Sequence, residues 1–131
     1  MGAFGVIGIA RSGVSAANSW MNAISHNLAN VNTRTRVGEE PFRAQRVVLQ
    51  AEQGGEGAVV AGVVRDGRPA KLAFDPDDPL ADENGLVQLS GVDMATEMAD
   101  MIIATRHYQV NLRVVTAAEE SYKAALQIGR R

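Results

Sequence analysis

The stretch SHNLANVNTRT (residues 25–35) ends the first helical pattern of the chain and places three asparagines close together. Asparagine is unfavourable inside a helix because its amide competes for backbone hydrogen bonds, and it tolerates the left-handed backbone conformation. Asn27, Asn30 and Asn32 are therefore expected to stop the helix and to hydrogen-bond the turn that follows. Side chains that the turn does not use would be free to bind neighbouring molecules. The stretch predicts a joint between a helix and the rest of the fold.

An apolar seam leads into this joint. Its members alternate at spacings of three and four residues, as on one face of a coiled-coil helix: Ile7, Ala10, Val14, Ala17, Met21, Ile24, Leu28 and Val31. Gly5, Gly8 and Gly13 weaken the early part, because glycine is a poor helix former. The pattern predicts a helix over residues 12–28, with fraying before it.

The polar face of this helix carries no charge. Residues 12–33 contain no Asp, Glu, Lys or Arg, and their polar positions hold Ser12, Ser15, Asn18, Ser19, Asn22, Ser25 and His26. A solvated helix face usually carries charged residues. Short neutral side chains favour a face that is later pressed against protein, and the alternative is a serine-rich helix that stays exposed.

The chain ends in a longer helical pattern, which begins at Asp93 and runs to about Ile128. Its seam comprises Met94, Met98, Met101, Thr105, Tyr108, Leu112, Val115, Glu119, Tyr122 and Leu126, and Ile102, Ile103, Val110 and Val114 widen it. A helix of about 36 residues is about 54 Å long. A compact domain of this chain length has a radius of gyration of only about 14 Å. The helix should therefore project from any compact body, and its apolar stripe needs a partner.

Between the two helices the pattern changes to short β-branched runs. Residues 43–50 and 58–65, joined by EQGGEG, predict a hairpin, and residues 71–74 and 86–89 predict a third and a fourth strand. The predicted fold class is α+β, with long N- and C-terminal helices forming a coiled-coil-like pair around a small β module. The predicted divisions are residues 1–33, the N-terminal helix of the core; 34–91, the β module with its loops; and 92–131, the C-terminal helix of the core.

Composition excludes several classes of function. At 131 residues the chain is one domain by size, and its net charge of −2 argues against nucleic-acid binding. It contains no cysteine, which excludes disulfides, cysteine-ligated zinc and thiol catalysis. Arg11 follows the apolar N-terminal residues, the reverse of a secretory signal peptide, and no apolar run reaches the length of a membrane span. These rules predict a soluble protein that does not insert into a membrane and carries no cleaved export signal.

The sequence does not favour catalysis or a cofactor. His26 and His107, the only histidines, have no apparent metal-binding or acid–base partners. The acidic loop at residues 75–85 fails the EF-hand pattern, because Pro79 stands at the fifth position, and a proline-punctuated loop with a turn at Asn84-Gly85 fits better. No serine-nucleophile, phosphate-loop or dinucleotide motif is present.

A cluster of four arginines follows the joint: Arg34, Arg36, Arg43 and Arg46. Nucleic-acid binding is one interpretation, but Glu39 and Glu40 interrupt the cluster. Pairing with acidic groups, or exposure to solvent, is the favoured alternative.

Several stretches resemble one known family. ISHNLANVNT resembles the N-x-A-N-x-x-T signature of bacterial flagellar axial proteins, with Asn27, Ala29, Asn30 and Thr33 on its fixed positions. PFRAQRVVL (41–49), FDPDDPLADENGLVQLSGVDM (74–94), EMADMIIATRHYQVN (97–111) and AAEESYKAALQIGR (117–130) resemble stretches of a proximal rod component of that family. The sequence departs from the usual Pro-Asn at Ser90-Gly91 and from the usual histidine at Asp78, which puts in doubt any contact made by that histidine.

The resemblance implies a non-enzymatic structural subunit of the flagellar basal-body rod, the shaft that transmits motor torque. Its terminal helices would form an inner layer around the axial channel, with the β module farther out. Its partners would be copies of itself and other rod proteins in a helical assembly, components of the basal-body base, and the flagellar type III apparatus that exports it unfolded. The alternatives are another rod or hook-adaptor subunit, or an enzyme acting on the cell wall, which would need paired acidic residues in a cleft.

The seams and the signature supply the candidate interface residues. Ile7, Val14, Met21, Ile24 and Leu28 are expected to pack against Met98, Met101, Tyr108 and Leu112, within or between chains. The full predicted set adds Asn27, Asn30, Thr33, Ile102 and Tyr122.

Overall fold

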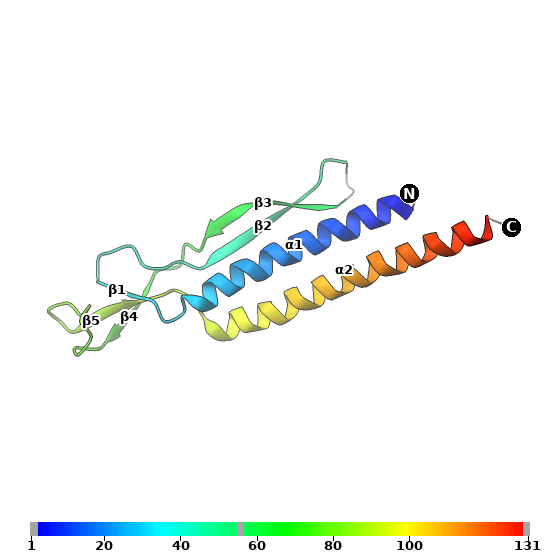
Figure 1. The fold of residues 1–131 in the computed structure, drawn as a ribbon. Helices are drawn as coiled ribbons and strands as arrows, with labels where there is room; N and C mark the ends of the chain where they lie inside the picture. Colours follow the sequence, from blue (N-terminus) through cyan, green and yellow to red (C-terminus); the bar gives the residue numbers. More distant parts are fainter. Residues whose placement is uncertain (1–2, 55–56, 130–131) are drawn as a thin grey trace.

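Two long helices lie side by side along an elongated molecule, with two small sheets beside and beyond them (Figure 1). The structure is a computed structural model that describes residues 3–54 and 57–129. The elements are α1 (Ala3–Ala29), β1 (Arg34–Thr35), β2 (Gln45–Ala51), β3 (Ala58–Arg65), β4 (Lys71–Phe74), β5 (Leu86–Leu89) and α2 (Met94–Ile128). The predicted α+β class is confirmed. Residues 1–2 and 130–131, at the ends of the predicted helical segments, and residues 55–56 of the EQGGEG turn lie outside the described residues.

The first helix begins earlier than the glycines suggest. The prediction of fraying before Ser12 is wrong for the described residues, since α1 is continuous from Ala3. Tertiary contacts explain the difference. A Cβ on Gly13 would lie 2.7 Å from the Asn111 side chain of α2. The Ser12 hydroxyl donates to the Ile9 carbonyl at 2.7 Å and accepts from the Ala58 N–H of β3 at 3.1 Å. Packing against both neighbours therefore stabilises a segment whose intrinsic helix propensity is low.

The joint after α1 is a hydrogen-bonded turn, as predicted. The Asn30 side chain donates to the His26 carbonyl at 2.9 Å, and the Thr33 hydroxyl donates to Asn30 Oδ1 at 3.2 Å. Backbone bonds from Asn30 N–H to the Asn27 carbonyl and from Thr33 N–H to the Asn30 carbonyl complete the turn. At the end of α1 the Asn30 side chain thus binds the His26 carbonyl, and the backbone N–H groups of Asn30 and Val31 bind the carbonyls of Asn27 and Leu28.

The second helix has the predicted bounds. It follows Asp93, whose carboxylate accepts a hydrogen bond from the Thr96 hydroxyl; that bond lowers the pKa of Asp93. α2 runs antiparallel to α1 and extends past its N-terminal end (Figure 1). α1 accompanies α2 over most of its length, so the predicted pair of terminal helices is confirmed and α1 is the partner that the long helix was expected to need.

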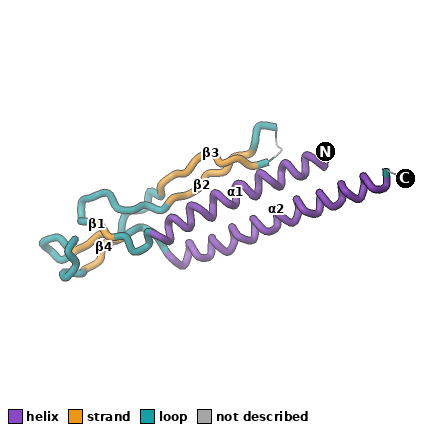
Figure 2. Tube along the Cα trace, in the orientation of Figure 1, coloured by secondary structure: helices purple, strands orange, loops and turns teal. Residues whose placement is uncertain are grey.

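The strands form two separate sheets rather than one module (Figure 2). β2 and β3 pair as the predicted antiparallel hairpin, with an irregularity between Val48 and Leu49, and the hairpin lies along α1 on the side away from α2. β1, β5 and β4 form a second antiparallel sheet beyond the ends of the helices. The predicted strands at 71–74 and 86–89 are confirmed, and the two-residue β1 was not predicted.

Small side chains dominate the core. Among the described residues, the large apolar side chains that are buried are Ile24, Val87 and Val92. The other buried apolar residues are alanines: Ala10, Ala16, Ala17, Ala23, Ala44 and Ala104. Alanine and glycine let α1 approach α2 and the hairpin closely. The larger apolar side chains of α2 consequently remain outside this core.

Candidate assembly interface

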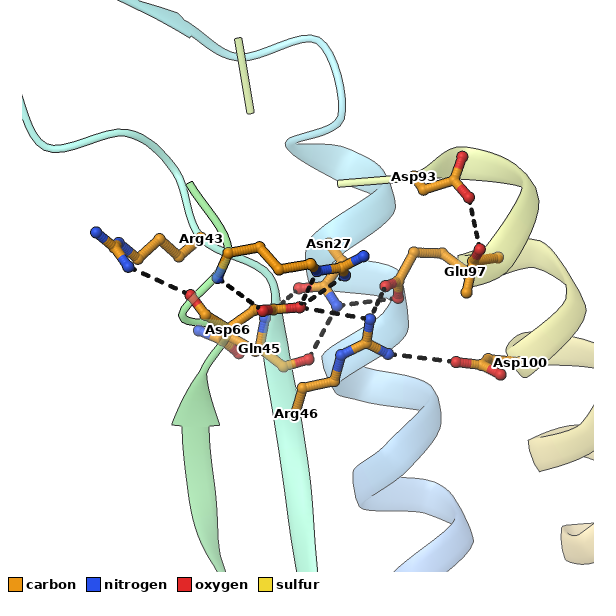
Figure 3. A network of polar contacts seen from close by, with 10 residues as sticks. Asn27, Arg43, Gln45, Arg46, Asp66, Asp93, Glu97 and Asp100 are labelled. Atoms are coloured by element: carbon orange, nitrogen blue, oxygen red, sulfur yellow. Dashed lines mark hydrogen bonds and ion pairs between the residues drawn. The ribbon is translucent and has the colours of Figure 1, made fainter. Parts of the chain in front are cut away.

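A buried amide ties three elements together at the joint (Figure 3). Asn27, fully buried near the end of α1, donates to the Gln45 carbonyl of β2 and to Glu97 Oε2 of α2, both at 2.9 Å. Its Oδ1 accepts the Gln45 N–H at 2.7 Å. Every polar atom of the Asn27 amide therefore has a partner, and the three hydrogen bonds join α1 to both neighbours.

The buried carboxylate of this cluster is balanced by an arginine from β2. Glu97 is 1% exposed, and its Oε1 lies 3.4 Å from Arg46 Nη2. Arg46 also lies 3.3 Å from the Asp100 carboxylate and 3.8 Å from that of Asp66. We call Asn27, Gln45, Arg46, Glu97 and Asp100 the polar clamp. A buried charge is costly unless it is paired, so the clamp is stable only when all three elements are in place.

Asp66 connects the clamp to the end of the hairpin. Two hydrogen bonds from the Arg68 side chain and backbone lower the pKa of the Asp66 carboxyl, with a smaller contribution from Arg46. The Asp66 N–H donates to the Ala44 carbonyl at 2.7 Å, and the Asp66 carbonyl accepts from Arg43 at 3.5 Å. Arg43 and Arg46 are thus engaged within the chain, as is Arg34, whose guanidinium pairs with Asp75 and Asp78.

The expectation that Asn27 stops the helix and hydrogen-bonds the turn is wrong, because Asn27 lies within α1 and its amide binds Gln45 and Glu97. The sequence analysis assigns no role to Gln45 or Glu97. The only signal in the sequence is spacing: Glu97 and Ala104 are seven residues apart and so share a face of α2, and the structure buries both.

The predicted seam residues fall into two groups in the structure. Ile24 is buried between the helices, whereas Ile7, Val14, Met21 and Leu28 are half-buried. On α2, Met101 and Tyr108 are half-buried. Met98, Ile102, Leu112 and Tyr122 are exposed, by 56%, 57%, 46% and 41% of their surface. Contacts between the helices include Gly13 with Asn111, Asn27 with Glu97 and the seam residue Met21 with Thr105.

Two rows of mostly apolar residues, one on each helix, share a seven-residue spacing. Ile7, Val14, Met21 and Leu28 recur every seven residues on α1, as do Met98, Thr105 and Leu112 on α2. The two rows meet where the Thr105 hydroxyl lies 3.7 Å from Met21 Sδ. We call these seven residues the apolar flank. Of these residues Met98 and Leu112 are exposed, and the other five are half-buried.

The uncharged polar face of α1 also remains open. Ser15, Asn18, Asn22, Ser25 and His26 are exposed, whereas Ser12 and Ser19 are half-buried and Ser12 contacts β3. Asn32 is exposed as well, while Asn30 and Thr33 are half-buried within the turn.

The other candidate groups are engaged within the described part of the chain. His26 lies 5.5 Å from the Phe42 ring and His107 lies 6.3 Å from the Trp20 ring, measured between centroids. In the acidic loop, Asp82 Oδ1 accepts the Asn84 and Leu86 N–H groups, and Gly85 adopts φ +73°. Among residues 3–54 and 57–129 no group of three or more acidic or histidine side chains is arranged to hold a metal ion. Within the same ranges, neither helix is apolar enough over a sufficient length to cross a bilayer.

Comparison with known proteins identifies close relatives. A family model described as the C-terminal part of the flagellar basal body rod FlgEFG proteins matches residues 83–128. The flagellar basal-body rod protein FlgC of Salmonella typhimurium is 34% identical over 134 residues, covering 99% of this chain and all of that protein. The FlgC proteins of Borreliella burgdorferi and Bacillus subtilis are 32% and 31% identical over 149 and 150 residues, covering 98% and 99% of this chain.

Proposed function

The chain belongs to the FlgC family of flagellar basal-body rod proteins, and from this premise we propose that it is a structural subunit of the rod that assembles through its apolar flank. Its partners are copies of itself and other rod proteins in a helical assembly, which transmits motor torque. The observation that carries the proposal is the apolar flank, which leaves Met98 and Leu112 exposed on α2 and its α1 members half-buried.

The energetics favour association at this surface. Burying apolar surface contributes about 25 cal/mol per Å². Met98 and Leu112 each expose about half of their surface in the monomer, so covering them supplies a substantial driving force. The flank lies on one edge of the helix pair. A neighbour that covers it with a different surface makes a head-to-tail contact, which generates an open helical assembly rather than a closed dimer.

The uncharged face of α1 is suited to be the surface with which a neighbouring copy covers the flank. Ser15, Asn18 and Asn22 are small, neutral and exposed. A neighbouring helix can approach them closely, and no charge has to be desolvated when it does. The exposed seam residues Met98, Ile102, Leu112 and Tyr122 are thus assigned to contacts between chains, and Ile24 and Met101 to the contact within the chain.

We propose further that the chain is exported through the flagellar type III apparatus. Transit requires an unfolded chain, and an alanine-rich core of few large side chains supports that requirement because it limits the stability of the monomer. The basal-body base components that the rod meets are further partners in this proposal.

The test uses paired substitutions at two exposed residues of α2, Met98 on the flank and Ile102 beside it. Met98→Asp and Ile102→Asp place charges on exposed sites, so the purified variants should keep the helical circular dichroism of the parent while rod assembly and swimming are lost in a deletion strain. Met98→Leu and Ile102→Leu keep the surface apolar and should restore swimming. Leu28→Asp is less selective, because Leu28 is half-buried and the charge would also disturb the monomer.

Normal rods with either folded aspartate variant would contradict the assignment of the flank. An absence of this chain from purified basal bodies would contradict the proposed function itself.

A further inference from the structure

An aromatic side chain stands exposed at the end of the molecule opposite the termini. β4 is an edge strand of the three-stranded sheet beyond the helix ends (Figure 1). Leu72 and Phe74 are two residues apart and so lie on the same face of the strand. They expose 56% and 73% of their surface. Large apolar side chains at an edge strand favour association, because the strand also presents unpaired backbone groups. We call Leu72, Phe74, Asp77 and Glu83 the tip.

The structure holds this aromatic in place rather than leaving it loose. The Phe74 ring lies over Gly85, where an added Cβ would come within 2.9 Å of the ring and 3.1 Å of Pro76. The loop beneath is braced by Arg34, which pairs with Asp75 and Asp78, and by Asp82, which accepts two backbone N–H groups. A pre-positioned aromatic loses little conformational freedom on binding, which is typical of an interface anchor.

Acidic residues surround the anchor. Asp77 and Glu83 are exposed, and neither takes part in an ion pair among the described residues. The surface therefore combines an apolar centre with a negatively charged rim. A partner for it should present an apolar groove with positive charge beside it.

The same chain carries such a groove on α2. Ile103, Arg106, His107 and Val110 line a shallow groove of about 390 Å³, and Arg113 follows one turn later on the same face. Ile103 and Val110 are 45% and 59% exposed. Within residues 3–54 and 57–129, Arg106 and Arg113 have no ion-pair partner. The tip lies beyond the helix ends, so Phe74 cannot reach the groove of its own chain (Figure 1).

We propose that Phe74 of one copy seats in the α2 groove of a second copy, with Asp77 and Glu83 facing Arg106 and Arg113. This inference rests on the proposed rod function and adds a specific contact between successive copies. The contact joins two different surfaces, so it repeats without closing. The groove lies beside Ile102. Because Ile102 is already assigned to contacts between chains, the groove adjoins that surface.

Cysteine pairs test the contact, because the chain contains no cysteine of its own. Asp77→Cys and Arg113→Cys variants are produced in one strain that lacks the native protein, and basal bodies are oxidised and separated without reductant. The expected product is a disulfide-linked dimer of the two variants. Asp77→Cys with Gln50→Cys is the control pair, since Gln50 is exposed on β2 outside every surface assigned to association, and should give no dimer.

Charge reversal provides a second experiment. Full-length cysteine variants are mixed in solution at equal concentration, and the yield of disulfide-linked dimer is measured. Glu83→Arg in the Asp77→Cys partner should lower dimer yield about tenfold, the equivalent of about 1.4 kcal/mol, and Arg106→Glu in the other partner should restore much of it. Failure of the second change to restore yield would overturn the assigned pairing.

Dimer yield in basal bodies equal to that of the control pair would overturn the contact while leaving the rod function intact, provided the chain is present there. Photo-cross-linking from position 74 identifies the occupant without a disulfide. Cross-links from this position to a different rod protein, and none to a second copy, would overturn the choice of a second copy. Absence of the chain from basal bodies would overturn the rod function on which the inference depends.

Discussion

At the scale of single residues, Asn27 decides how α1 meets its neighbours. Its amide makes hydrogen bonds to the β2 backbone and to the buried carboxylate of Glu97. A serine or an alanine at this site could not reach both partners. An aspartate would place a second negative charge against Glu97. The chemistry of the clamp therefore requires an amide, which explains why this asparagine lies inside a helix despite its low propensity.

Replacing Asn27 with alanine should lower the free energy of unfolding by about 2–3 kcal/mol, because buried groups on Gln45 and Glu97 lose their partners. Denaturant unfolding of the purified chain measures this change. Asn32→Ala is the control, since that side chain is exposed, and should change stability by less than about 0.5 kcal/mol. Equal effects of the two substitutions would contradict the clamp.

A pH dependence is expected from Asp66. Its pKa is lower in the folded protein than the unfolded value of about 3.9, because Arg68 and Arg46 stabilise the ionised form. The contribution of this carboxylate to stability is therefore fully present above pH of about 4 and is lost as the pH falls through the folded-state value. Unfolding free energies measured down to pH of about 2.5 should fall less steeply for Asp66→Asn than for the parent. Parallel curves would show that the arginine pairing contributes nothing.

At the scale of elements, the helix pair is held by small residues and flanked by large ones. Gly13 permits the approach of Asn111, and the buried alanines of α1 contribute little bulk. The close packing leaves Met98 and Leu112 to the side. In the proposed function, this exposed apolar surface is the one that meets other chains.

Leucine substitutions at two glycines of α1 distinguish the effect of helix propensity on stability from the effect of packing against α2. Gly8→Leu should stabilise the chain by up to about 1 kcal/mol, since leucine favours the helix and nothing lies within 4 Å of the added Cβ. Gly13→Leu should destabilise it by about 1–3 kcal/mol, because the side chain collides with Asn111. Thermal unfolding followed by circular dichroism compares the two. A stabilised Gly13→Leu variant would show that the helices do not meet closely there.

The elements themselves could be predicted from the sequence, because periodicity and turn residues determine them locally. Both helices, the hairpin and the strands at residues 71–74 and 86–89 follow from such patterns. The two-residue β1 could not be predicted, because it exists only by pairing with β5. The early start of α1 depends on contacts with Ala58 and Asn111, which lie far away in sequence. The clamp was missed for the same reason.

The position of the seam shows a further limit of pattern analysis. Spacings of three and four identified an apolar surface correctly, but periodicity does not say whether that surface faces the same chain or another. Alanine and glycine carry a weak apolar signal, so the face that packs within the chain was less visible than the face that does not.

At the scale of the whole molecule, the chain is an elongated part with surfaces left for others. The helix pair exposes the apolar flank, the uncharged face of α1 lies open, and an aromatic tip stands at one end. Each of these surfaces would be a liability for an isolated soluble protein. Together they describe a component with surfaces suited to an assembly, which agrees with its membership of the rod protein family.

The most direct test of assembly through the flank is photo-cross-linking from position 98 in intact basal bodies. A diazirine amino acid replaces Met98 in the deletion strain, and cross-linked peptides from purified basal bodies are identified by mass spectrometry. The account predicts cross-links from position 98 to the helices of another copy or of another rod protein. If the chain is present in basal bodies and position 98 reacts only with water, the flank is not an interface and the central claim is wrong.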